Sequence, residues 1–138
     1  MKINLKKFCY QMGSGRVKEQ LGQPWSRGGF TYASNFHIIV RVPRVKDVPG
    51  NRKAPKAEGL NWNRRTKKSD WKRIPDILKV NPEYGGRGVR LGWHVFDEKY
   101  LKMIKRLPEP EIAVGVKKYT AVPFRFSGGE GILMPMYY

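Results

Sequence analysis

The sequence predicts an α+β fold in which two helices pack on an antiparallel sheet. Two observations lead to this prediction. Residues 4–12 and 97–107 carry apolar side chains at helical spacing. Most other apolar residues fall in short alternating runs, which Gly, Pro and Asn residues separate. With 138 residues, 40% of them hydrophobic, the chain has the size of one domain and enough apolar side chains for a core. We therefore expect a single domain over residues 1–138.

The first half of the chain predicts one helix followed by one hairpin. Residues 4–12 form the helix, and residues 16–29 are polar and rich in glycine. Residues 29–34 and 36–43 are typical of strands because they alternate aromatic residues with smaller ones or contain β-branched runs. Asn35 favours a tight turn between them, since asparagine tolerates left-handed backbone angles.

The second half predicts a long loop, a clear helix and several strands. Residues 44–70 are basic and contain many turn formers, which indicates an inserted mobile loop. Residues 97–107 form the helix, with Asp97 as its N-cap and Pro108 as its end. The predicted strands are residues 88–96, 111–116, 120–126 and 130–136.

The two halves also share a pattern that predicts an internal pseudo-repeat. Residues 30–43 (FTYASNFHIIVRVP) and 124–136 (FRFSGGEGILMPM) each read aromatic, spacer, aromatic, small turn, apolar run and proline. The predicted helices begin at similar distances before these two hairpins. A duplicated helix-plus-hairpin unit would again give an α+β domain.

The charge of the chain is strongly positive. It holds 28 Lys and Arg against 11 Asp and Glu, a net charge of +17. Residues 46–73 are the densest part, with ten basic and three acidic residues. Such a field attracts polyanions, of which nucleic acid is the first candidate and an anionic membrane surface the second.

Cationic side chains cluster on the outer sides of the two predicted helices and in residues 62–73 (WNRRTKKSDWKR). Lys and Arg bind phosphates and release counterions. The predicted nucleic-acid-binding residues are Lys2, Lys6, Lys7, Arg64, Arg65, Lys67, Lys68, Lys72, Arg73, Lys102, Lys105 and Arg106. Trp62 and Trp71 are candidates for stacking on bases, with packing in the core as the equal alternative. No base-reading motif is visible, so binding should be directed to the backbone.

Four stretches resemble bacterial DNA polymerase sliding clamps. Residues 96–101 (FDEKYL), followed by Met103-Ile104, are similar to the last clamp helix, and residues 131–136 (GILMPM) to the clamp C-terminus. Residues 32–40 (YASNFHIIV) resemble a clamp hairpin, and residues 71–76 (WKRIPD) resemble a Phe-Pro-Asp segment more weakly. A clamp subunit has three such domains, whereas this chain has room for one.

The resemblance implies a clamp-like domain that binds duplex DNA without catalysis, in replication, recombination or repair. Its helices would face the duplex, with Lys7, Lys102, Lys105 and Arg106 on the backbone. A ring would require a homo-oligomer. The terminal segment Met134, Pro135 and Met136 would form a strand, and in this family it also borders a pocket for partner peptides.

Catalytic and metal-binding functions have little support. His37 and His94 have no nucleophile setting around them, the acidic residues are scattered, and Cys9 is the one cysteine. We therefore expect no enzyme activity, cofactor or metal. No apolar run approaches the ~18 residues of a membrane span, and no signal peptide is visible. A cytoplasmic protein with no membrane partner is the expectation.

Two other functions remain open. The chain could be a protein-interaction module that mimics or engages replication or defence machinery, its basic surface meeting an acidic protein or a nucleoprotein complex. It could also be an RNA-binding accessory, because basic loops with Trp and Gly suit RNA.

Overall fold

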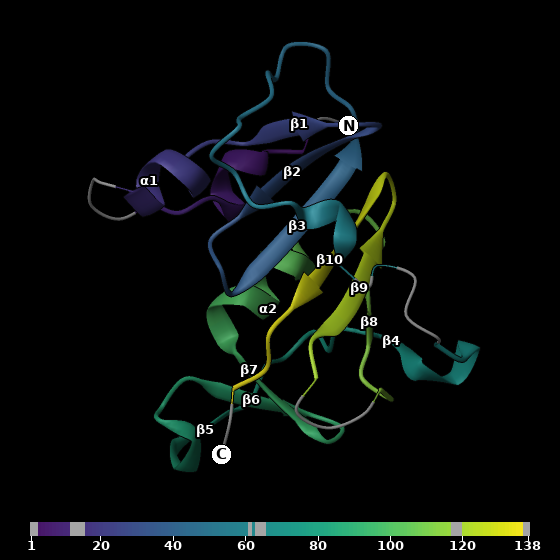
Figure 1. The fold of residues 1–138 in the computed structure, drawn as a ribbon. Coiled ribbons are helices and arrows are strands. Elements are labelled where there is room, and N and C mark those ends of the chain that lie inside the picture. The colour runs from purple at the N-terminus through teal and green to yellow at the C-terminus, as the bar shows by residue number, and fades with distance from the viewer. Residues whose placement is uncertain (1–2, 12–15, 61, 63–65, 117–119, 137–138) are drawn as a thin grey trace. The chain divides into compact units, whose positions relative to one another are not determined.

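The computed structural model describes residues 3–11, 16–60, 62, 66–116 and 120–136 (Figure 1). The chain forms two compact units. The first comprises Met1–Trp62 with Gly128–Gly131, and the second comprises Asn63–Ser127 with Ile132–Tyr138. Helices and antiparallel strands occur in both units, which confirms the α+β class.

The first unit is built on three antiparallel strands. They are β1 (Trp25–Arg27), β2 (Phe30–Ser34) and β3 (Ile38–Pro43). β2 pairs with β1 and β3 on its two sides. The 3₁₀ turn η1 (Leu5–Phe8) packs against β2 and β3, and the short helix α1 (Arg16–Leu21) precedes the sheet in the chain.

Large apolar side chains fill the core of this unit. Trp25 and Tyr32 are fully buried and stack with ring centroids 5.6 Å apart, since they lie opposite each other on β1 and β2. Leu21, Ile38 and Val40 are also buried. The buried Trp25 shows that the polar segment 16–29 is anchored at this residue.

The second unit contains two small groups of antiparallel strands. β8 (Glu111–Ala113) pairs with β4 (Trp71–Arg73) on one side and β9 (Val122–Phe126) on the other. The other group runs in the order β5 (Val80–Asn81), β6 (Gly88–Leu91) and β7 (His94–Asp97). The remaining strand, β10 (Gly129–Leu133), begins in the first unit and ends in the second. Two 3₁₀ turns in this unit are η3 (Lys68–Asp70) and η4 (Pro82–Tyr84), and a third, η2 (Ala57–Gly59), lies in the first unit.

Helix α2 (Glu98–Lys105) follows β7 and packs against it. The Asp97 side chain accepts a hydrogen bond from the Lys99 amide, as predicted for the N-cap. Leu101 and Ile104 are fully buried, at the spacing that places both on one face of the helix. The predicted helix over residues 97–107 is thereby confirmed to within two residues at its C-terminal end.

The predicted helix over residues 4–12 is wrong. Only η1 is helical there, and Cys9 already has extended backbone angles. Burial of Leu5, Phe8 and Cys9 needs a single turn, and so short a segment has little intrinsic helix stability. The α-helix of this region is instead α1, within the polar, glycine-rich segment 16–29.

The predicted single strand over residues 88–96 is also wrong, because the chain reverses in its middle. β6 and β7 form a hairpin whose turn contains Gly92, with φ of 62°. That left-handed angle suits glycine, and a Cβ at this position would lie 3.2 Å from the Val114 carbonyl oxygen. Trp93, the next residue, is 61% exposed.

The strand predicted over residues 130–136 is confirmed as β10, which ends at Leu133. The Met136 amide then donates a hydrogen bond of 2.7 Å to the Val95 carbonyl, which joins the terminal segment to β7. Strands β2 and β3, and strands β9 and β10, lie where the pseudo-repeat predicts its two hairpins. The helix predicted before the second hairpin is present as α2, whereas the helix predicted before the first is replaced by the 3₁₀ turn η1. The repeat therefore stays a prediction.

Burial makes Cys9 a poor nucleophile. Its side chain is 1% exposed, and desolvation raises the pKa of its thiol from 9.0 to about 11. We expect the native protein to react with iodoacetamide at pH 8 at least ~100-fold more slowly than the denatured chain. Mass spectrometry of the alkylated protein measures both rates, and equal rates would contradict the burial.

His94 is buried in the second unit and makes stability depend on pH. One ring nitrogen, Nε2, lies 2.9 Å from the Val116 carbonyl oxygen, and desolvation lowers the pKa of His94 below 6.5. The unfolded chain therefore binds a proton that the folded protein does not bind at the same pH. As pH falls through 6.5, the free energy of unfolding should decrease by at most ~1.4 kcal/mol per pH unit.

Urea denaturation at pH 7.5 and 5.5 measures this effect. The variant His94→Gln keeps a donor for the Val116 carbonyl but does not titrate, so it should lose this part of the pH dependence. An unchanged pH dependence in His94→Gln would show that another group is responsible.

Candidate nucleic-acid interface

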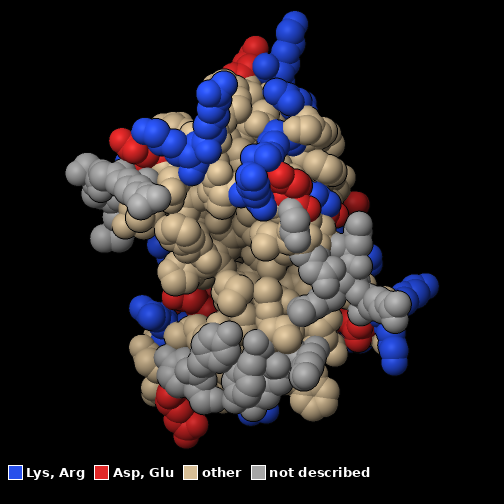
Figure 2. Space-filling model, in the orientation of Figure 1, with Lys and Arg blue, Asp and Glu red and all other residues tan. Residues whose placement is uncertain are grey.

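Both units carry excess positive charge. The first holds 12 basic and 4 acidic residues, and the second holds 16 and 7. On the face drawn in Figure 2, several Lys and Arg side chains extend beyond the surrounding surface, with acidic side chains among them. The question is which of these cations are free to bind an anion.

Ion pairs occupy part of the charge. In the described part of the chain, six of the eleven acidic side chains pair with a basic one. The pairs are Arg27–Glu58, Arg41–Glu130, Lys53–Glu19, Arg87–Asp97, Lys102–Glu98 and Arg125–Glu111. The other exposed Lys and Arg side chains of the described ranges form no ion pair.

The clearest free cations lie on and beside β4. Lys67 and Lys68 at η3, and Lys72 and Arg73 on β4, are all exposed. The carboxylate of the nearby Asp70 accepts a 2.7 Å hydrogen bond from the Lys67 amide. This carboxylate therefore already has a backbone partner. β4 pairs with β8 and with no other strand among the described residues, so these side chains lie at a sheet edge. We call Lys67, Lys68, Lys72 and Arg73 the β4 basic row.

The outer face of this sheet adds an arginine and a tryptophan. Trp71 and Arg73 alternate with Lys72, and their register partners place them on the same face as Glu111 and Arg125. The Arg125 guanidinium lies 4.0 Å from the centroid of the Trp71 ring and 3.1 Å from Glu111. The opposite face carries the fully buried Ile112 and its register partner Lys72, which is exposed because it lies on the edge strand. Trp71 is half-buried, so it stays a stacking candidate beside the β4 basic row.

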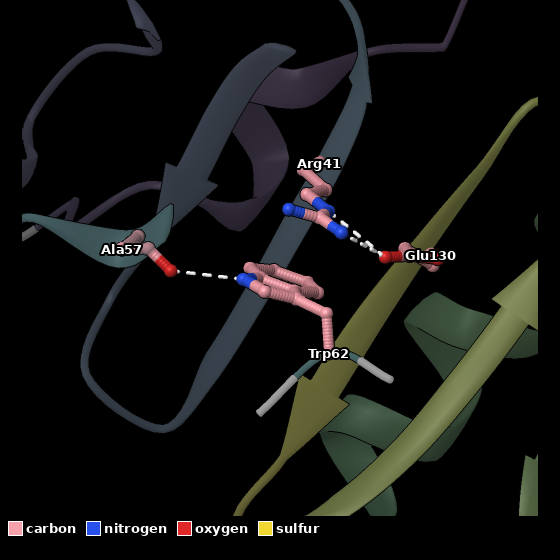
Figure 3. A network of polar contacts seen from close by, with 4 residues as sticks. All are labelled: Arg41, Ala57, Trp62 and Glu130. Carbon is pink, nitrogen blue, oxygen red and sulfur yellow. Dashed lines mark hydrogen bonds and ion pairs between the residues drawn. The ribbon is translucent and has the colours of Figure 1, made fainter. Parts of the chain in front are cut away.

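Trp62 has a different environment, in the first unit (Figure 3). It is 8% exposed, and its indole N–H donates a 2.8 Å hydrogen bond to the Ala57 carbonyl. The Arg41 guanidinium lies 4.2 Å from its ring centroid and 4.0 Å from that of Phe30. Two nitrogens of Arg41 also donate to one Glu130 oxygen, at 2.9 and 2.6 Å. Trp62 therefore packs in this cluster and offers little ring surface to a base, so we leave it out of the interface.

The cations of α2 are only partly free. Lys102 forms an ion pair of 2.5 Å with Glu98, one helical turn away. The Lys105 ammonium donates to the Asp76 carbonyl and is half-buried. Arg106 is exposed and directly follows the helix. Of the three predicted contacts on this helix, Arg106 is the one whose charge is most available.

The remaining predicted contacts divide into two groups. Lys6 and Lys7 are exposed on η1, in the first unit. Lys2, Arg64 and Arg65 lie outside the described residues. The structure thus places Lys6 and Lys7 in one unit and the β4 basic row and α2 in the other.

The predicted peptide pocket also stays a prediction. Met134 is 39% exposed, Pro135 is buried, and Met136 is half-buried beside Val95. Exposed methionine suits an adaptable contact surface.

Residues 3–11, 16–60, 62, 66–116 and 120–136 contain no group of three or more His, Cys, Asp or Glu side chains that could hold a metal ion. Likewise, no helix in those ranges is long and apolar enough to cross a membrane.

Sequence reasoning missed two surface features. One is Arg125, whose place between Phe124 and Phe126 in an alternating strand does indicate an outward-facing side chain. The other is Phe36, an exposed aromatic residue at the β2–β3 turn, which no local pattern separates from the core aromatics. Comparison of the chain with protein-family models, with curated proteins and with solved structures finds no match.

Proposed function

We propose that this chain is a non-catalytic nucleic-acid-binding protein that contacts the phosphate backbone of duplex DNA. The observation that supports this most is the β4 basic row, four exposed cations beside one acidic side chain that is turned to the backbone. Arg125 and Trp71 lie on the same sheet face as Arg73, while Lys72 leaves the edge strand on the other face. Backbone contacts of this kind fix position and carry little sequence information.

The physical basis of the proposal is counterion release. Each phosphate neutralised by Lys or Arg adds a slope of about −0.9 to log K against log salt concentration. Four contacts from the β4 basic row would give a slope near −3.6, and Arg106 would add to it.

The resemblance to sliding clamps supports a place in replication, recombination or repair. Two of the stretches that carry this resemblance form α2, in the second unit, and the terminal strand β10, which begins in the first unit and ends in the second. The contact proposed for Lys7 would come from a 3₁₀ turn instead of a helix. A ring would require several copies, so a homo-oligomer and a cytoplasmic location belong to the same proposal.

A second candidate function is a protein-interaction module that engages replication or defence machinery. The observation that favours it is a pair of exposed apolar side chains in the second unit, Ile77 at 77% and Trp93 at 61% exposure. Tryptophan is enriched among the residues that contribute most of the binding energy at protein contacts. Its basic surface would meet an acidic protein or a nucleoprotein complex.

Two experiments separate these candidates. Fluorescence anisotropy compares a labelled ~30 bp DNA duplex with an RNA duplex of the same sequence. Our proposal expects the DNA duplex to bind at least as tightly as the RNA. A pull-down from nuclease-treated lysate tests the alternative, because a protein partner is retained while nucleic acid is lost. Retention of a protein together with no DNA binding would favour the interaction module.

A further inference from the structure

Phe36 has a backbone conformation that a phenylalanine rarely adopts. Its φ is 78°, in the turn between β2 and β3, where glycine or asparagine would be unstrained. Its side chain is 59% exposed. Packing within the protein therefore recovers little of the cost of placing a large apolar residue there. Strained residues of this kind concentrate at functional sites.

Hydrogen bonds fix the turn in this form. The Phe36 amide donates to Ser34 Oγ at 3.2 Å. Asn35 Oδ1 accepts from the His37 amide at 3.0 Å and from the Ile38 amide at 3.2 Å. None of these bonds uses the Phe36 side chain, so a glycine could make the same turn. The ring is held outward by a turn that does not depend on it.

Cations lie at the same end of the first unit. η1 packs against β2 and β3, and it carries the exposed Lys6 and Lys7. Cys9, directly after η1, lies against the backbone of Ser34, which immediately precedes the turn. Glu19, the acidic residue of α1, is already paired with Lys53. The turn that carries Phe36 and the turn that carries Lys6 and Lys7 therefore lie close to each other in the first unit, and the charge of Glu19 is already paired.

We propose that Phe36 stacks on an unpaired base while Lys6 and Lys7 contact the adjoining phosphates. An aromatic ring beside cations is the arrangement that proteins use for unpaired nucleotides, because every base has a face to stack on. This inference rests on the proposed nucleic-acid binding and defines its substrate: DNA that contains unpaired bases, such as a gap. Phe36 is then a binding residue.

Substitution of Phe36 separates binding from stability. Phe36→Gly and Phe36→Asn relieve the backbone strain and remove the ring. Both should bind a duplex with a gap of a few nucleotides about tenfold more weakly than the wild type does, because they lose one stacked base. Affinity for the intact duplex should stay the same. The melting temperature should rise by about 3 °C. A 2-aminopurine base in the gap should change fluorescence with the wild type and not with these variants.

Leu60→Ala is the matched control, since Leu60 is an apolar residue of the same unit with 46% exposure. It should leave both affinities unchanged. Equal binding of the gapped duplex by wild type and Phe36→Gly would overturn the inference and leave the proposed function intact. A lower melting temperature in both Phe36 variants would also overturn it, by showing a structural role for the ring. If the wild type binds neither duplex, the proposed function fails as well.

Discussion

Replacement of Arg41 by alanine is expected to lower the free energy of unfolding by about 3 kcal/mol. The Arg41 side chain is 10% exposed, lies over the rings of Phe30 and Trp62, and donates twice to Glu130. Its removal leaves Glu130 without its partner and opens a space between the two rings. Because Glu130 is 35% exposed and regains some water, the loss should fall at the lower end of the range for buried pairs.

The chain supplies a matched control for this prediction. Arg125 has the same kinds of partner, a ring at 4.0 Å and a carboxylate at 3.1 Å, but its side chain is 48% exposed. Arg125→Ala should therefore cost at most ~1 kcal/mol. Urea denaturation followed by tryptophan fluorescence measures both variants. If Arg41→Ala and Arg125→Ala lower the free energy of unfolding by the same amount, burial does not determine how strongly the contacts of Arg41 stabilise the protein.

Charge reversal in the β4 basic row is expected to have the largest effect on function. A triple variant with Lys68→Glu, Lys72→Glu and Arg73→Glu should bind duplex DNA at least ~100-fold more weakly near 0.1 M salt. It loses three phosphate contacts and adds three repulsive charges. All three side chains are exposed, so the fold should be retained. Anisotropy titration measures the affinity, and circular dichroism checks the fold.

A second triple variant controls for net charge. Lys46→Glu, Arg52→Glu and Lys56→Glu make the same change of charge at exposed positions in the loop of the first unit. We expect less than ~10-fold weakening, from the reduced long-range field alone. If both triple variants weaken binding equally, the chain binds DNA through its total charge and the β4 basic row has no special role.

The parts of the fold that sequence reasoning predicted are those with strong local signals. α2 has an N-cap, an apolar face and a proline soon after its end, and these fix its position. β2 and β3 contain aromatic or β-branched runs on either side of a turn at Asn35. The positive φ falls on Phe36 instead, and the Asn35 side chain accepts hydrogen bonds from the amides of His37 and Ile38.

The errors have equally physical causes. Helix α1 is six residues long, which is too short for a helical period to stand out in the sequence. In residues 88–97, the alternation of side chains continues through Gly92, although a glycine inside a strand pattern often marks a turn. The periodicity of a strand does not show where a hairpin reverses.

The candidate site shows the same limit. Its cations are visible in the sequence, but their availability depends on tertiary contacts. Lys102 is paired with Glu98, Lys105 donates to the Asp76 carbonyl, and Trp62 is covered by Arg41. Only the Lys102–Glu98 pair has a sequence signal, its i,i+4 spacing. The other two contacts join residues 29 and 21 positions apart, which no local pattern reports.

The salt dependence of duplex binding tests the central claim most directly. Fluorescence anisotropy with a labelled ~30 bp duplex, repeated from about 50 to 300 mM salt, gives the slope of log K against log salt concentration. We predict tight binding at low salt and a slope steeper than about −3, as expected for the four cations of the β4 basic row. No binding at the lowest salt, or a slope near zero, would contradict a surface that binds phosphates.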